Sequence, residues 1–129
     1  MPEGVVSEVE SKRSIDPYLY DLAKASNVSR ELVEHIHPLV AAWDLGQGES
    51  EVLTLAMQKE EAVVVLDDLQ ARKCAALFQI PLTGSLGLLV MAKRTGHINA
   101  VKPEIEKLSK VGLRIDSAML GRIYKNTGE

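Results

Sequence analysis

A short apolar run that ends in two aspartates, AVVVLDD from Ala62 to Asp68, constrains the fold of this chain more than any other stretch. A continuous, β-branched run of this length is typical of a strand that is covered on both faces of a sheet. A helical pattern that begins at Glu49 precedes it, and a second one from Leu69 to Phe78 follows it. This order of helix, strand and helix predicts an α/β fold with a parallel sheet.

Three carboxylates are predicted to gather at one end of this strand. Asp67 and Asp68 follow the apolar run, and ligands of open parallel α/β sheets bind at the carboxyl ends of strands. Glu49 comes after a glycine-rich breaker, in the first turn of the preceding helix, where unpaired N–H groups favour a carboxylate. We expect this set to hold a hard cation. The alternative is that Asp67 and Asp68 only end a strand and cap a helix.

Composition limits the class of protein. The 129 residues suffice for one domain with a core, and the net charge of −3 gives no general attraction to nucleic acid. Cys74 is the single cysteine, so no intramolecular disulfide can form, and its place on an apolar helix face predicts a small core residue rather than a nucleophile. We find no signal peptide and no apolar run long enough for a membrane span. A soluble, cytoplasmic protein is expected.

The remaining pattern is mostly helical. The segment from Gly84 to Thr95 is apolar over most of its circumference, so we expect a helix there that is largely buried. The other predicted helices lie at Pro2–Val9, Pro17–Ala25, Ser29–Ile36, Val101–Val111 and after Asp116.

Three segments carry a resemblance to a known family. They read GESEVLTLA from Gly48, VVVLDDLQARK from Val63 and IPLTGSLGLLVMAKRTGHI from Ile80. Together they resemble the PIN-like nuclease domain, and more narrowly the stand-alone prokaryotic PIN-like proteins. The likeness runs from about Pro2 to Gly128. It implies a single PIN-like domain over residues 1–129, with three layers in which helices flank a short parallel sheet. It also implies a metal-dependent ribonuclease, often the toxin of a toxin–antitoxin pair.

The resemblance also implies a set of site residues. Glu8 stands where a P-E-x-V-x-x-E helix of the family supplies an acidic residue, and otherwise it would lie at the solvent edge of an amphipathic helix. With Glu49, Asp67 and Asp68 it forms a set of oxygen ligands that suits Mg²⁺ or Mn²⁺. Glu51 lies two positions after Glu49, so we expect only Glu49 to reach the site and Glu51 to face solvent.

One departure from the family affects the expected function. The family's first strand, the middle strand of its sheet, carries an aspartate that has no counterpart here. Its loss would expose the edge beside Val63–Val65, and metal binding should be weak. Two functions are then possible: a ribonuclease acting on RNA, with an antitoxin protein as partner, or a non-catalytic binding and assembly module. We expect a homodimer or larger assembly that covers the edge, unless the N-terminal helices seal it within one chain.

Overall fold

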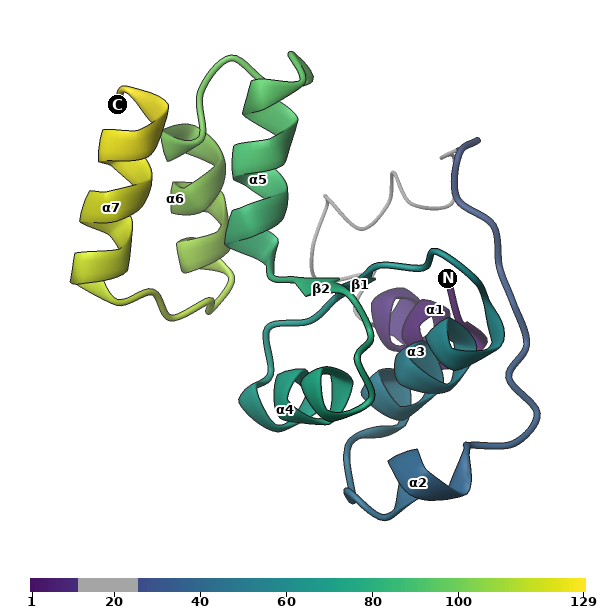
Figure 1. Ribbon diagram of the computed structural model, residues 1–129. Coiled ribbons are helices and arrows are strands. Elements are labelled where there is room, and N and C mark those ends of the chain that lie inside the picture. Colours follow the sequence, from purple (N-terminus) through teal and green to yellow (C-terminus); the bar gives the residue numbers. More distant parts are fainter. Residues whose placement is uncertain (12–25) are drawn as a thin grey trace. The chain divides into compact units, whose positions relative to one another are not determined.

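The computed structural model describes residues 1–11 and 26–129, which divide into two compact units, Met1–Leu82 and Thr83–Glu129 (Figure 1). The described part is mixed α/β with a short parallel sheet of two strands, as expected. None of its helices is long and apolar enough to cross a membrane. The helix predicted at Pro17–Ala25 lies outside the described residues.

The elements are α1 (Glu3–Ser11), α2 (Pro38–Ala41), α3 (Gln47–Gln58), β1 (Val64–Val65), α4 (Leu69–Leu77), β2 (Leu82–Thr83), α5 (Ser85–Arg94), α6 (Lys102–Lys110) and α7 (Ser117–Thr127).

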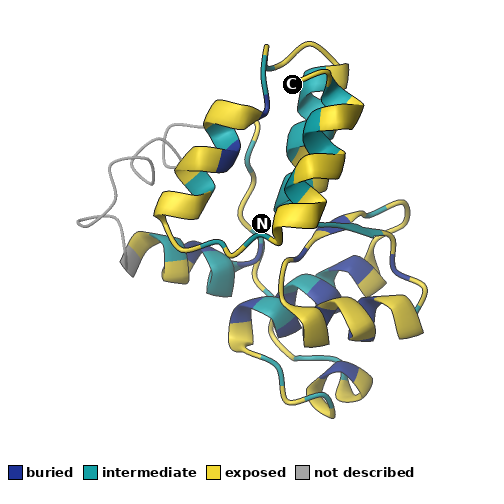
Figure 2. Ribbon diagram, turned by 90° about the vertical axis from the view of Figure 1, so that its left-hand side faces the viewer, coloured by how far each residue is buried: buried dark blue, intermediate teal, exposed yellow. Residues whose placement is uncertain are grey.

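Helix α3 is the centre of the first unit, because it contacts α1, α2, α4 and β1. Its apolar positions recur at helical spacing, and Leu53 is completely buried. Figure 2 colours the ribbon by burial, with the buried residues in dark blue. Cys74 of α4 belongs to the same core, and burial raises the pKa of its thiol. Its predicted role as a small core residue is confirmed. The buried core of this unit consists of Val40, Leu53, Ala56, Val64, Leu66, Ala71, Cys74, Ala75 and Ile80.

Strand β1 is covered on one face only. The Val64 N–H donates to the Pro81 carbonyl (2.9 Å) beside β2, and the Val64 side chain is buried. Its neighbours Val63 and Val65 are 59% and 45% exposed. The prediction of a strand covered on both faces is therefore wrong. The reason is that β1 has only β2 as a sheet partner among the described residues, while α3 packs against the buried face.

Two glycines allow α1 and α3 to pack closely. A Cβ on Gly4 would lie 2.7 Å from Cδ of Glu51 and closer still to its Oε2, and a Cβ on Gly48 would lie 2.8 Å from Oε1 of Glu8. Glu51 is only 4% exposed, so the expectation that it faces solvent is wrong. Its Oε1 accepts a hydrogen bond of 3.2 Å from the Gly4 N–H, in the first turn of α1, where N–H groups lack partners within the helix.

The segment predicted as a helix from Ser29 to Ile36 is not helical. Glu31 forms a parallel bridge with Pro2: its N–H donates to the Met1 carbonyl, and its carbonyl accepts from the Glu3 N–H, both at 2.8 Å. Backbone pairing with the N-terminal residues thus replaces the helical hydrogen bonds that the pattern predicted.

The second unit consists of α5, α6 and α7. Its core includes Val101 and Ile105, which are buried. The Glu129 carboxylate accepts hydrogen bonds from the Val101 N–H (2.9 Å), the Lys93 ammonium (2.9 Å) and the Lys102 N–H (3.1 Å). It therefore joins the start of α6 to the last turn of α5. These bonds, that from Val101 foremost, lower the pKa of Glu129 from 4.5 to about 2.

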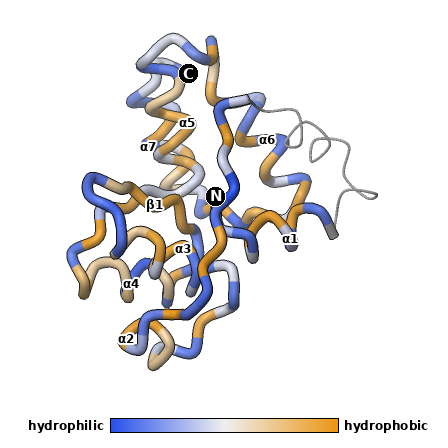
Figure 3. The backbone as a smooth tube through the Cα atoms, turned by 90° about the vertical axis from the view of Figure 1, so that its right-hand side faces the viewer, coloured by the Kyte–Doolittle hydropathy of each residue, from blue (hydrophilic) through white to orange (hydrophobic). Residues whose placement is uncertain are grey.

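Helix α5 is more exposed than its composition predicts. Figure 3 shows hydrophobic residues along much of its length, yet none of its residues is buried. Leu88 is 45% and Met91 53% exposed. The expectation of a largely buried helix is therefore wrong. Its contact with α7 covers one side of a helix whose apolar residues occupy more than one side.

The close contact of α1 with α3 predicts that Gly4→Ala lowers the free energy of unfolding of the first unit by about 1 to 3 kcal/mol, because the added methyl group forces Glu51 to move. Urea unfolding followed by the fluorescence of Trp43, the single tryptophan, which packs against this unit's core, measures the change. Gly121→Ala in α7 is the matched control: its Cβ would meet open space, and circular dichroism should show unchanged or higher stability. A Gly4→Ala chain as stable as the unmodified one would contradict the packing.

The lowered pKa of Glu129 predicts a pH-dependent stability of the second unit. Since the folded pKa of about 2 lies below the ordinary value of 4.5, the stabilisation is complete above pH 4.5 and disappears as the pH falls toward 2. Glu129→Gln should therefore lower the Tm at neutral pH, and the difference from the unmodified chain should shrink in acid. Thermal unfolding of both chains, followed by circular dichroism between pH 2 and pH 7, tests this prediction. A Tm difference between the two chains that does not change with pH would refute it.

Candidate functional site

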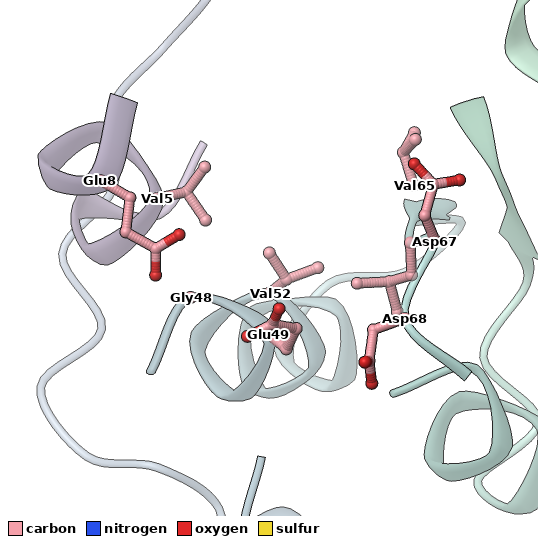
Figure 4. A pocket seen from close by; sticks show the side chains of 9 residues that line it. Val5, Glu8, Gly48, Glu49, Val52, Val65, Asp67 and Asp68 are labelled. Atoms are coloured by element: carbon pink, nitrogen blue, oxygen red, sulfur yellow. The ribbon is translucent and has the colours of Figure 1, made fainter. Parts of the chain in front are cut away.

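A hollow of about 270 Å³ at the carboxyl end of β1 is lined by the four carboxylates that the sequence singled out. We call it the acidic hollow. All of the ionisable side chains that line it are acidic, and apolar side chains complete its walls (Figure 4). The lining residues are Val5, Glu8, Gly48, Glu49, Val52, Val65, Leu66, Asp67 and Asp68.

Local structure explains how the two glutamates reach this hollow. Glu8 lies on α1, one turn after Gly4, and its carboxyl group rests against Gly48, where a larger residue would displace it. Glu49 lies in the first turn of α3. Its carboxyl group is folded back against the N-cap residue Gly46, since a Cβ on that glycine would collide with Glu49 Oε2. Both positions thus depend on glycines of the loop and first turn at the start of α3.

The two aspartates have different surroundings. Asp68 is the N-cap of α4, and its Oδ2 accepts a hydrogen bond of 2.9 Å from the Ala71 N–H. Asp67 precedes it in extended chain, and the two side chains point in opposite directions (Figure 4). Neighbouring residues of an extended segment do so because side chains alternate between its two sides. The predicted capping by Asp68 is confirmed.

The four carboxylates line the hollow without meeting at one point. Glu8 lies across the hollow from Asp67 and Asp68, with Glu49 of α3 between them (Figure 4). Within residues 1–11 and 26–129, no group of three or more His, Cys, Asp or Glu side chains is close enough to hold a metal ion. The oxygen donors have the chemistry that Mg²⁺ and Mn²⁺ prefer. In this arrangement, however, at most two of the four carboxylates can bind the same ion.

Sequence reasoning missed the residues that shape this site. From the sequence alone, Gly48 is only part of a helix breaker and Gly4 has no assigned role, although both determine how closely α1 approaches α3. The sequence carries no local signal for such contacts, because each glycine faces a residue from a distant part of the chain. The exposed Arg72 and Lys73 of α4, about one turn after Asp68, are the cationic side chains nearest to Asp68 along the chain.

Comparison with known proteins gives one match. A family model, DUF3368, described as a PIN domain, matches residues 1–129 and so covers both compact units. The searches of curated proteins and of solved structures found no match. PIN domains are nuclease-type domains that generally use divalent metals. The resemblance that the sequence motifs indicated is confirmed, and the chain belongs to the PIN domain family.

Proposed function

We propose that this chain is a metal-dependent ribonuclease of the PIN type, which hydrolyses phosphodiester bonds of RNA with Mg²⁺ or Mn²⁺. The observation that carries the proposal is that the acidic hollow gathers Glu8, Glu49, Asp67 and Asp68 from three separate parts of the chain. The hollow lies at the carboxyl end of β1, where parallel α/β proteins bind their ligands. A toxin role, with an antitoxin protein as its inhibitor, stays a prediction.

The donor set suits a weakly bound ion that the substrate helps to hold. Glu49 with either Asp67 or Asp68 would ligate it, while Glu8, across the hollow, would accept hydrogen bonds from water that surrounds the ion. Mg²⁺ commonly keeps several waters and binds through one or two carboxylates together with substrate phosphates. When bound, such an ion would supply a water for attack on the phosphodiester and positive charge for the leaving oxygen. We therefore expect weak binding by the protein alone and tighter binding with RNA.

The chain's own residues would position the RNA and the water. The carboxylates can accept hydrogen bonds from water in the hollow, whose apolar lining includes Val52 and Leu66. The net charge of −3 does not attract RNA, so local positive charge must do so. Arg72 and Lys73 on the exposed side of α4 can provide it.

A second candidate function is a non-catalytic binding and assembly module. Two observations on residues 1–11 and 26–129 favour it: no three carboxylates converge there, and no strand of this part pairs with the side of β1 opposite β2. In this case the acidic hollow would bind a cationic group of a partner rather than a catalytic ion.

A cleavage assay separates the two candidates. We expect the chain to cut single-stranded RNA with Mn²⁺ or Mg²⁺ and to stop when EDTA removes the ion. Glu49→Gln and Asp68→Asn should each lower the rate by about tenfold or more, the size of effect seen even for groups that only support metal ligands. Asparagine also caps helices well, so Asp68→Asn removes the charge without removing the cap.

Glu106→Gln is the matched control, because Glu106 is an exposed carboxylate on α6 outside the hollow. The Glu106→Gln variant should cleave RNA at the same rate as the unmodified chain. Cleavage that persists in both hollow variants would exclude the acidic hollow as the active site. A folded chain without any metal-dependent cleavage would favour the binding module.

A further inference from the structure

The two compact units carry opposite net charges. The second unit, Thr83–Glu129, contains eight lysine and arginine residues and four aspartate and glutamate residues, which gives it a net charge of +4. The first unit contains seven basic and fourteen acidic residues, which gives it a net charge of −7. The overall charge of −3 does not reveal this difference. Such an asymmetry within one chain indicates that the basic part binds a polyanion, nucleic acid above all.

Most cations of the second unit have no carboxylate partner in the described part of the chain. Lys93 forms an ion pair with Glu129 at 2.9 Å. Lys107 forms one with Glu104, also at 2.9 Å. The remaining cationic side chains are exposed and form no ion pair with a described residue, so they can bind an anion from outside. They are Arg94, Lys102, Lys110, Arg114, Arg122 and Lys125.

Three of these unpaired cations lie at one end of the unit, where α5 ends, α6 begins and α7 ends (Figure 1). Two contacts join the helices there. The Lys93 ammonium in the last turn of α5 donates to the Thr127 carbonyl of α7 at 2.6 Å. The Lys102 ammonium of α6 lies 5.8 Å from the centroid of the Tyr124 ring of α7. We call the three cations at this end, Arg94, Lys102 and Lys125, the basic end.

Helix dipoles explain only part of the basic end. A cation is favourable in the last turn of a helix, which accounts for Arg94 in α5 and Lys125 in α7. Lys102, however, is the first residue of α6, where the dipole disfavours positive charge. Its ammonium lies over the face of Tyr124, which attracts a cation. Residues that break a local rule of helix stability are typical of functional sites, so Lys102 points to an anionic ligand.

We propose that the basic end of the second unit binds the phosphate backbone of single-stranded RNA. The choice of RNA as the ligand rests on the proposed ribonuclease function. Lysine and arginine contacts to phosphates position a nucleic acid without reading its sequence, so the basic end would hold RNA rather than select it. Arg122 lies three positions before Lys125, on the same side of α7, and extends the basic surface along that helix.

Fluorescence anisotropy with a short dye-labelled oligouridine tests the proposal, in EDTA so that the RNA is bound but not cleaved. Lys102→Gln and Lys125→Gln should each weaken binding by about threefold to tenfold. Each should also lower the magnitude of the slope of log affinity against log salt concentration by about 0.7, because one phosphate contact to a single strand is lost.

Lys110→Gln is the matched control, since it removes the same charge from an exposed and unpaired lysine of the same helix. Lys110 lies about 12 Å from Lys102 along α6, which exceeds the Debye length of about 8 Å at physiological salt. The Lys110→Gln chain should therefore bind RNA like the unmodified chain. Equal weakening by Lys110→Gln and Lys102→Gln would overturn the proposal, because general charge would then account for binding. Circular dichroism checks that each variant is folded.

A cleavage assay with Mn²⁺ separates this inference from the proposed function. Cleavage by the unmodified chain, with RNA binding unchanged in Lys102→Gln and Lys125→Gln, would overturn the inference and leave the ribonuclease standing. Binding that depends on these lysines, in a chain that does not cleave RNA, would support the inference and exclude the ribonuclease. Absence of RNA binding, or binding of phosphatidylglycerol vesicles in place of RNA, would also overturn the inference.

Discussion

The close packing of α1 on α3 is the contact on which the first unit depends. Gly4 and Gly48 let the helices approach, and Glu51 is buried between them. Among the residues that the structure describes, its buried Oε2 has no hydrogen-bond partner, which is unfavourable, while its Oε1 accepts from the Gly4 N–H at the start of α1. The same contact places Glu8 at the edge of the acidic hollow. Without it, the hollow would lose the wall that α1 provides.

The acidic hollow shares a wall with an apolar hollow of about 420 Å³ beside β1. Val5 and Val52, from α1 and α3, line both of them, so one helix pair shapes a polar site and an apolar hollow together. The oxygen donors of the acidic hollow have the chemistry that a hard cation or a basic side chain prefers. Both candidate functions therefore use the same part of the fold. What separates them is whether the carboxylates act on a metal ion and RNA or on a protein segment.

Local patterns predicted much of this structure. The apolar run before Asp67 predicted β1, helical patterns after Asp68 and Asp116 predicted α4 and α7, and the motifs identified the family, because each depends on residues close together in sequence. The burial of Glu51 could not be predicted, since it depends on Gly4, 47 positions away. Pairing with Met1 likewise decided the conformation near Glu31. The exposure of α5 and of the β1 edge depends on what packs beside them, which periodicity does not specify.

The acidic hollow, rather than any other acidic surface, is the cation site that we propose for this chain. Paramagnetic broadening of amide NMR signals during a Mn²⁺ titration tests this assignment most directly. We expect the signals of Glu49, Asp67 and Asp68 to broaden first, while those of Glu104 and Glu106 on α6 stay sharp. Broadening that begins on α6, or that proceeds equally at both places, would contradict it.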